Sequence, residues 1–374
     1  MRPSILLAVI FLAVVIGLHY YVLHRLGQLV PSPAGRITVI ALGFAAICMF
    51  FLHFFLGDIV NPAVIKVFYR VGGSWLVIFL YLFLIFIIAD ILRLLPFIPS
   101  GWILPRGWTS FFSLLAFIAL ILIAGSFNYR NKQRVELNLP ITKAGGAMRE
   151  LTVVAMSDLH LGGAVGKKEF ESWLPLINAE KPDIILIAGD IVDSRLRPLI
   201  EENFAESLRK LSAPLGVYAS VGNHEFIANV DRCVDFLESA DITVLRDSAV
   251  LINNSFYLAA RDDHSNRNRK PLAEIIAAVD KAKPVILLDH QPHNLEEAAQ
   301  NGIDLQISGH THNGQVWPMS IFTGRMFEKV HGYIKKGATH IYVSSGIGIW
   351  GGKFRIGSRS EYVVGKILFD RLEP

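Results

Sequence analysis

Cysteine and charged residues are both scarce in this sequence of 374 residues. The first scarcity bears on disulfide bonds and the second on nucleic-acid binding. The two cysteines, Cys48 and Cys233, lie far apart, so a disulfide framework is not expected and nothing demands an oxidising compartment. Charged residues make up 18% of the chain, the net charge is +4, and no long basic tract occurs. The composition therefore gives no reason to expect a nucleic-acid partner.

Hydrophobic residues are abundant instead, and they are unevenly distributed. They make up 52% of the chain, which is too much for a wholly soluble protein, and the excess lies before about Arg130. This distribution predicts a membrane region at residues 1–127 followed by a soluble region. Four apolar segments have the roughly 20 residues needed to cross a bilayer. We expect four transmembrane helices, at 5–23, 37–56, 75–92 and 108–127.

Basic residues near the ends of these segments predict the orientation. The side that holds both termini has six of them, namely Arg2, Lys66, Arg70, Arg130, Lys132 and Arg134. The opposite side has four, namely Arg25, Arg36, Arg93 and Arg106. Because the side with more Lys and Arg usually faces the cytoplasm, the soluble region is expected there.

The stretch 128–147 is abruptly polar, and we expect it to be a linker. Within it, residues 135–139 alternate between apolar and polar side chains, which is typical of a short edge strand. The remainder, 148–374, is expected to fold as one domain.

One pattern recurs in that domain: a short apolar strand, then a polar cluster, then a helix-like stretch. Continuous apolar runs are typical of strands buried on both faces. Five of these runs are 151–156, 184–188, 217–221, 285–288 and 305–308. Ligands bind beyond the carboxyl ends of strands in open α/β sheets, so polar loops are expected to cluster on one rim. The predicted fold class is an α/β domain, a β-sandwich flanked by helices.

The residues that follow these strands are of the types that bind metals. They are Asp158, His160, Asp190, Asn223, His290, His310 and His312. Oxygen and nitrogen donors without a thiolate suit Mn, Fe, Zn or Co. Seven donors are too many for one open site and fit two ions bridged by a carboxylate. Singly, each residue is more often a helix cap, a core histidine or a turn residue, but their recurrence at five strand ends favours the metal site.

The order of the motifs resembles the calcineurin-like metallophosphoesterase superfamily. Asp-x-His, Gly-Asp-x-x-Asp, Gly-Asn-His-Glu, a lone His and Gly-His-x-His follow one another between Asp158 and His312. The wording Gly-His-Thr-His-Asn-Gly-Gln and the fusion to apolar segments look like the bacterial membrane-associated branch that includes YkuE-like and YaeI-like proteins. The resemblance covers the soluble domain and leaves the apolar segments outside it.

This resemblance implies a role for each residue. Asp158, His160 and His312 would hold one divalent ion, while Asn223, His290 and His310 would hold a second, with Asp190 bridging both. His224 would bind no metal and would stabilise charge on the substrate phosphate or protonate the leaving oxygen. A hydroxide shared by the ions would attack phosphorus. Three further carboxylates, of Asp193, Glu225 and Asp289, would orient ligand imidazoles, or in the case of Asp289 cap a helix.

The expected function is that of a membrane-anchored phosphoesterase that hydrolyses a phosphodiester or pyrophosphate, with a lipid-linked substrate favoured because apolar helices keep the site at a bilayer. The implied location is a bacterial inner or plasma membrane. The apolar stretches 317–322 and 347–350 are either a lip that faces the bilayer or ordinary core. Two alternatives stay open: a phosphoprotein phosphatase with the same chemistry, and a non-catalytic, metal-stabilised membrane scaffold or sensor.

Overall fold

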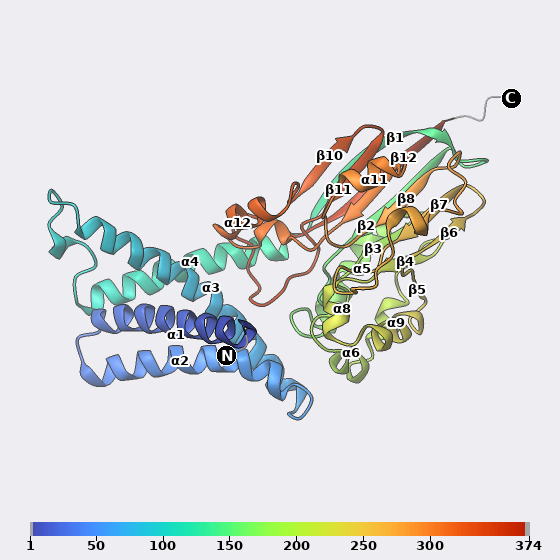
Figure 1. Cartoon of the computed structure of the whole chain (residues 1–374). Coiled ribbons are helices and arrows are strands. Elements are labelled where there is room, and N and C mark those ends of the chain that lie inside the picture. Colours follow the sequence, from blue (N-terminus) through green and yellow to red (C-terminus); the bar gives the residue numbers. More distant parts are fainter. Residues whose placement is uncertain (1–2, 371–374) are drawn as a thin grey trace. The chain divides into compact units, whose positions relative to one another are not determined.

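The structure, a computed structural model, describes residues 3–370, and the chain divides into two compact units (Figure 1). The first unit comprises Met1–Gly125 with the short segment Gly351–Lys353. The second comprises Ser126–Trp350 and Phe354–Pro374. The boundary therefore falls a few residues before Arg130, where the sequence becomes polar.

The first unit is helical. Ser32 and Asn61 cap the helices that follow them, because their side chains accept hydrogen bonds from the amides of Gly35 and Ala63, and a proline follows each cap. The elements are α1 (Pro3–Leu29), α2 (Pro33–Leu56), α3 (Pro62–Arg93), the 3-10 helix η1 (Ser100–Trp102) and α4 (Trp108–Arg130).

Three of these helices, α2, α3 and α4, are long and apolar enough to cross a membrane, within the part of the chain that the structure describes. The expectation of four spans is corrected to three. In the second half of α1, Tyr21 and Arg25 donate hydrogen bonds to Asp90 on α3, at 2.6 and 2.5 Å. Helix α3 also begins 13 residues before the predicted start at residue 75, and it includes two basic residues that were expected in a loop.

The second unit contains two six-stranded sheets. The strand order of the first is β1-β12-β2-β3-β4-β5 and that of the second is β10-β11-β9-β8-β7-β6. The first sheet comprises β1 (Gln133–Ala144), β2 (Glu150–Met156), β3 (Ile184–Ala188), β4 (Val217–Ser220), β5 (Ile242–Val244) and β12 (Glu361–Asp370). The second comprises β6 (Ser248–Ile252), β7 (Phe256–Ala260), β8 (Val285–Leu288), β9 (Leu305–Ser308), β10 (Gly332–Lys336) and β11 (Thr339–Val343).

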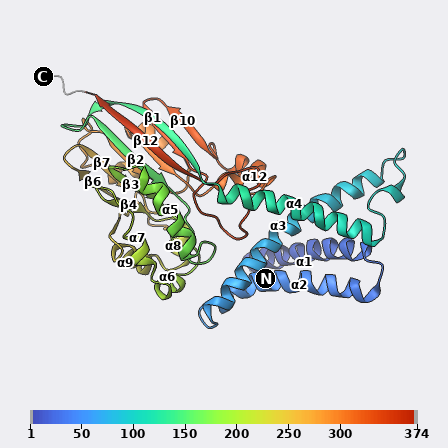
Figure 2. The same ribbon diagram turned by 180° about the vertical axis from the view of Figure 1, so that it is seen from behind.

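Short helices connect the strands of this unit, and α5 is the longest of those described. It buries Phe170, Trp173 and Ile177, and Figures 1 and 2 both show it beside β3. The helices are α5 (Lys167–Ala179), α6 (Arg197–Glu201), α7 (Phe204–Leu208), α8 (Asn223–Ile227), α9 (Val230–Glu238), α10 (Leu272–Ile275), α11 (Glu296–Gln300), the 3-10 helix η2 (His312–Gly314) and α12 (Met319–Met326).

The core of the second unit is shared by the two sheets. Val153 and Leu186 of the first sheet belong to the same buried apolar cluster as Leu258 and Ile286 of the second. Strands β2, β3 and β4 pair in parallel, as do β7, β8 and β9. Parallel strands end on the same side of their sheet, so the predicted α/β domain with two sheets is confirmed and its strand ends are available for a common site.

The edge strand expected at 135–139 is present but longer, because β1 covers most of the interval 128–147 that was expected to be a linker. This strand pairs in parallel with β12, from Gln133 opposite Glu361 to Ala144 opposite Asp370. The partner lies more than 200 residues away in sequence, so no local pattern could reveal the pairing. The polar stretch therefore forms the edge of the first sheet.

We expect the inward face of β12 to stabilise this edge. Ile367 is fully buried in the shared core, whereas its neighbour Leu368 is 50% exposed. Replacing Ile367 with Ala removes buried methyl groups and leaves a cavity, which typically costs about 2–5 kcal/mol. The Ile367→Ala chain should therefore melt at a clearly lower temperature in detergent, as followed by tryptophan fluorescence. Leu368→Ala is the matched control, and an equal loss in both variants would contradict this account of the core.

Candidate metal centre

The backbone beyond the strand ends is unusual at the predicted donors. Five of the seven have positive φ angles between 47° and 70°, a region that residues other than glycine seldom occupy. They are Asp158, His160, Asp190, His310 and His312. Such conformations persist only where the surroundings enforce them, and they concentrate at functional sites. The turns after β2, β3 and β9 thus hold a strained backbone conformation, and this conformation sets the direction of the side chains.

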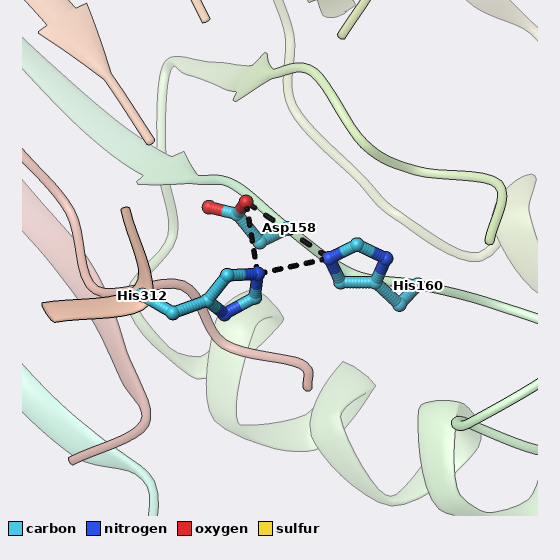
Figure 3. Close-up of side chains that lie close together, drawn as sticks. All are labelled: Asp158, His160 and His312. Carbon is cyan, nitrogen blue, oxygen red and sulfur yellow. Dashed lines mark hydrogen bonds and ion pairs between the residues drawn. The ribbon is translucent and has the colours of Figure 1, made fainter. Parts of the chain in front are cut away.

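A first group of donors comes from the ends of β2 and β9. Nε2 of His160 lies 3.1 Å from Nε2 of His312, and the latter nitrogen lies 3.4 Å from Oδ1 of Asp158 (Figure 3). Nε2 of His160 is 4.0 Å from the same oxygen. Figure 3 shows both rings directed at one another and at the carboxylate. These three residues form a cluster with the composition and spacing of a metal site.

A second group comes from the ends of β3, β8 and β9. Nε2 of His290 lies 3.2 Å from Oδ2 of Asp190, and His310 completes a cluster that could hold a metal ion. Nδ1 of His310 lies 2.9 Å from Oδ1 of Asn223, the first residue of α8. The side chain of Asn223, which was predicted to be a metal ligand, therefore lies in this second group.

Asp190 lies between the two groups. Its Oδ2 atom is 3.8 Å from Nε2 of His160 in the first group and 3.2 Å from Nε2 of His290 in the second. The carboxylate is 2% exposed, and its Oδ1 atom accepts a hydrogen bond from the amide of His224. This is the position that a bridging carboxylate would occupy.

His224 joins a further cluster with His160 and Asp190. Its ring lies 4.5 Å from that of His160, but its Nδ1 atom is engaged elsewhere. That nitrogen lies 3.1 Å from the carbonyl oxygen of Asp193 and 3.3 Å from the carboxylate of the same residue. One ring nitrogen is thus held by Asp193 and Nε2 stays available, as in His290, so the expectation that His224 binds no metal stays a prediction.

The hydrogen bonds of His290 indicate that a cation fits between His290 and Asp190. Its Nδ1 atom lies 2.7 Å from the carbonyl oxygen of Ala188, so Nδ1 carries the proton and donates it. Its Nε2 atom then presents a lone pair to the carboxylate of Asp190, and this buried nitrogen has no hydrogen-bond partner among the described residues. Two facing lone pairs require a cation between them, and a divalent metal ion meets that requirement.

The electrostatics of the site keep two of the predicted ligand imidazoles, those of His310 and His312, neutral and ready to bind a cation. Burial, aided by neighbouring His290, lowers the pKa of His310 to about 4, and burial next to Arg355 lowers the pKa of His312 well below its usual value. Burial also lowers the pKa of His290, but the carboxylate of Asp190 outweighs it and holds this pKa well above 6.5. Without a metal, a proton would therefore be held between His290 and Asp190.

The three further carboxylates have different surroundings. Asp193 faces imidazoles, since its Oδ1 atom lies 3.7 Å from Nδ1 of His160 and 3.3 Å from Nδ1 of His224. Glu225 instead accepts hydrogen bonds from the backbone amides of Asp190, Val192 and Gly222 at 2.7–3.0 Å. Asp289 pairs with Arg269 and Arg261. Glu225, expected to orient an imidazole, instead binds backbone amides, and Asp289, expected to orient an imidazole or cap a helix, pairs with two arginines.

Sequence reasoning missed Arg355, which lies against His312. Its fully buried guanidinium donates to the carbonyl oxygen of His312 at 2.8 Å and lies 3.2 Å from Nδ1 of the same ring. It also donates to the carbonyl oxygens of Ser345 and Gly348. Burial lowers the pKa of Arg355 to about 10, so it stays charged at neutral pH. Nothing in the local sequence signals this role.

Known proteins share these features. Residues 151–314 match a family model described as Calcineurin-like phosphoesterase. An uncharacterized metallophosphoesterase of Aquifex aeolicus is 34% identical over 66% of this chain and 97% of that protein. A transmembrane protein with metallophosphoesterase domain from Danio rerio is 32% identical over 66% of this chain, but only 60% of its own length is matched. The uncharacterized metallophosphoesterase YkuE of Bacillus subtilis is 28% identical over 53% of this chain and 72% of YkuE.

We expect Arg355 to position His312. In Arg355→Gln the ring loses its charged partner, and loss of such a supporting contact typically weakens metal binding about 10- to 100-fold. The apparent dissociation constant for Mn²⁺, measured by competition with a fluorescent chelator, should rise accordingly. Arg359→Gln is the control because its guanidinium is exposed. Unchanged affinity in an Arg355→Gln chain that melts as a folded protein would contradict this role.

Proposed function

Because this chain belongs to the metallophosphoesterase family, whose members hydrolyse phosphoester bonds with metal ions, we propose that it is a membrane-anchored phosphoesterase with two metal ions. The bond cleaved is a phosphodiester or a pyrophosphate. The observation that carries the proposal is the pair of donor groups on either side of the buried carboxylate of Asp190. One ion would not need donors from five strand ends.

The donors divide between the two ions. Asp158, His160 and His312 would hold one ion. His290, His310 and Asn223 would hold the other. Asp190 would be shared. When bound, such ions neutralise charge on phosphoryl oxygens and lower the pKa of a coordinated water. The left-handed turns described above would fix the donors before the ions arrive.

His224 is proposed to act on the substrate. Burial lowers its pKa, but the carboxylates of Asp190 and Asp193 raise it to about 9, so the ring carries a proton at neutral pH. A positively charged imidazole beside the donor groups can stabilise negative charge on a phosphoryl group or give a proton to the leaving oxygen. Asp193 fixes the ring because it accepts from Nδ1.

The exposed apolar side chains around α12 support a lipid-linked substrate. Trp317, Ile321, Phe322 and Met326 are 48–70% exposed, and this segment follows His312 directly in the chain. Four large apolar side chains in water are unfavourable, whereas an acyl chain or a bilayer surface would cover them. The other half of the expected lip is core, because Ile347 and Ile349 are fully buried.

The helices of the first unit complete the proposal. Helices α2, α3 and α4 and the transmembrane relative indicate a membrane protein. Its location in a bacterial inner membrane and the cytoplasmic side of the second unit stay predictions, supported by the count of basic residues.

Two variants separate metal binding from catalysis. The intact chain with added Mn²⁺ should hydrolyse bis(p-nitrophenyl) phosphate. Asp190→Ala should lose both bound metal and activity, because both groups share that carboxylate. His224→Ala should keep its metal and lose activity by about a hundredfold or more, since general acid catalysis typically contributes 10²–10⁴. Metal is measured by plasma mass spectrometry and activity by release of p-nitrophenol.

His293→Ala is the matched control for this pair, because His293 lies outside the donor groups and hydrogen-bonds only Gln291 among the described side chains. It should keep both metal and activity. Equal activity in the intact chain, Asp190→Ala and His224→Ala would sink the enzyme proposal and favour the scaffold or sensor. Faster cleavage of phosphopeptides than of diesters would favour the phosphoprotein phosphatase.

The apolar segment at α12 is tested by the form of the substrate. Phe322→Ser should slow hydrolysis of a p-nitrophenyl phosphodiester with a long alkyl chain, presented in phosphatidylcholine vesicles, by severalfold. The rate with soluble bis(p-nitrophenyl) phosphate should not change, because the side chain is exposed. The control is Leu251→Ser, which removes a 40% exposed side chain from β6. Equal slowing with both substrates would argue against a lipid-linked substrate.

A further inference from the structure

A basic pocket lies within the helical unit, at the end of α1, the start of α2, the end of α3 and the loop before α4. Its volume is about 380 Å³, and four arginines line it: Arg25, Arg36, Arg93 and Arg106. They are the residues that the orientation analysis placed together on the side opposite the termini. Phe86 and Leu29 supply apolar walls. The pocket shares no residue with the candidate metal centre.

The positive charge of this pocket is only partly balanced. Asp90 pairs with Arg25 at 2.5 Å and with Arg93 at 3.1 Å, both through Oδ1. The side chains of these two arginines are only 16% and 26% exposed, so water screens them poorly. Four guanidinium groups against one carboxylate leave a net charge of +3. Like charges held this close in a partly dry site favour an anion between them.

Arg36 has hydrogen-bonding capacity to spare. Its Nε atom is buried and has no hydrogen-bond partner among the described residues, and the same holds for Nε of Arg25. Because these two nitrogens are buried, an anion in the cavity would meet the outer nitrogens of the same guanidinium groups. In contrast, Arg106 and Arg93 donate to the carbonyl oxygens of Pro31 and Ile103, both at 2.7 Å, which fixes their positions.

The surroundings indicate what kind of anion fits. Guanidinium groups bind phosphate with paired, charge-assisted hydrogen bonds. The pocket lies at the ends of apolar helices, and Trp102 and Trp108 nearby in the chain are 81% and 45% exposed, as tryptophans at a membrane interface are. Basic pockets between transmembrane helices commonly bind lipid headgroups.

We propose that this pocket binds a negatively charged phosphate group at the membrane surface, as carried by an anionic phospholipid headgroup or by free phosphate. The guanidinium groups of the lining arginines would donate to the phosphate through their outer nitrogens, and Phe86 and Leu29 would contact the glycerol or first methylenes of a lipid. This site does not depend on the proposed phosphoesterase activity, and either could exist without the other.

The test uses the full-length chain in a non-ionic detergent and short-chain lipids, with binding measured by isothermal titration calorimetry. Dihexanoyl phosphatidylglycerol should bind at least tenfold more tightly than dihexanoyl phosphatidylcholine. Arg36→Gln should weaken phosphatidylglycerol binding about tenfold, because it removes charge-assisted hydrogen bonds. Arg106→Gln, at an exposed position, should also weaken it. Arg70→Gln, an exposed arginine on α3 outside the pocket, should bind as the unchanged chain does.

Inorganic phosphate distinguishes the two sources of the ligand. If millimolar phosphate leaves phosphatidylglycerol binding unchanged, the site takes a headgroup, and if phosphate displaces the lipid from the unchanged chain, the site takes free phosphate. Both results support the shared chemistry. Equal binding of the two lipids, or equal weakening by Arg70→Gln and Arg36→Gln, would overturn the proposal. Circular dichroism of each variant shows that the helices remain folded, and retained hydrolysis of the aryl diester keeps this result separate from the catalytic proposal.

Discussion

A carboxylate that is buried between imidazoles is the constraint on which the second unit depends. An isolated charge loses its hydration on burial, at a cost that only opposite charge and hydrogen bonds can offset. Asp190 receives a hydrogen bond from the amide of His224, and it faces Nε2 of His290 at 3.2 Å, where a proton or a metal ion would supply the opposite charge. Glu225 then holds the backbone of Asp190 itself. The strained turns follow from this requirement, because the donors converge on one carboxylate only if the chain bends sharply where each strand ends.

The two sheets make that convergence possible. Strands β2, β3 and β4 belong to one sheet and β8 and β9 to the other, and the shared core holds the sheets face to face. Donors of the first group come from both sheets, as do those of the second. The site therefore lies where two layers meet, and its geometry is as rigid as their packing. Arg355, from the segment that precedes β12, holds the imidazole of His312 in place against the two sheets.

The sequence predicts what is local and misses what is distant. Apolar runs that end in Asp, Asn or His predicted five of the strands and the residues of the three clusters, because each signal lies within about eight residues. The pairing of β1 with β12 joins segments more than 200 residues apart, so only a short edge strand at 135–139 was predicted within the expected linker 128–147. The same limit concealed Arg355, the backbone contacts of Glu225 and the gathering of four arginines in one pocket. The polar contacts between α1 and α3 likewise emerge only when the helices pack.

The place of β12 in its sheet also determines when the fold can be completed. The strand lies between β1 and β2, although it is the last strand described in the chain. During synthesis the helices of the first unit leave the ribosome first. Strand β1 then has no strand to pair with until Glu361–Asp370 emerges. Until that moment β1 is an open edge able to pair with foreign strands. The alternating polar side chains of β1 keep this unpaired edge soluble. The polar stretch after α4 therefore matters before the native sheet has formed.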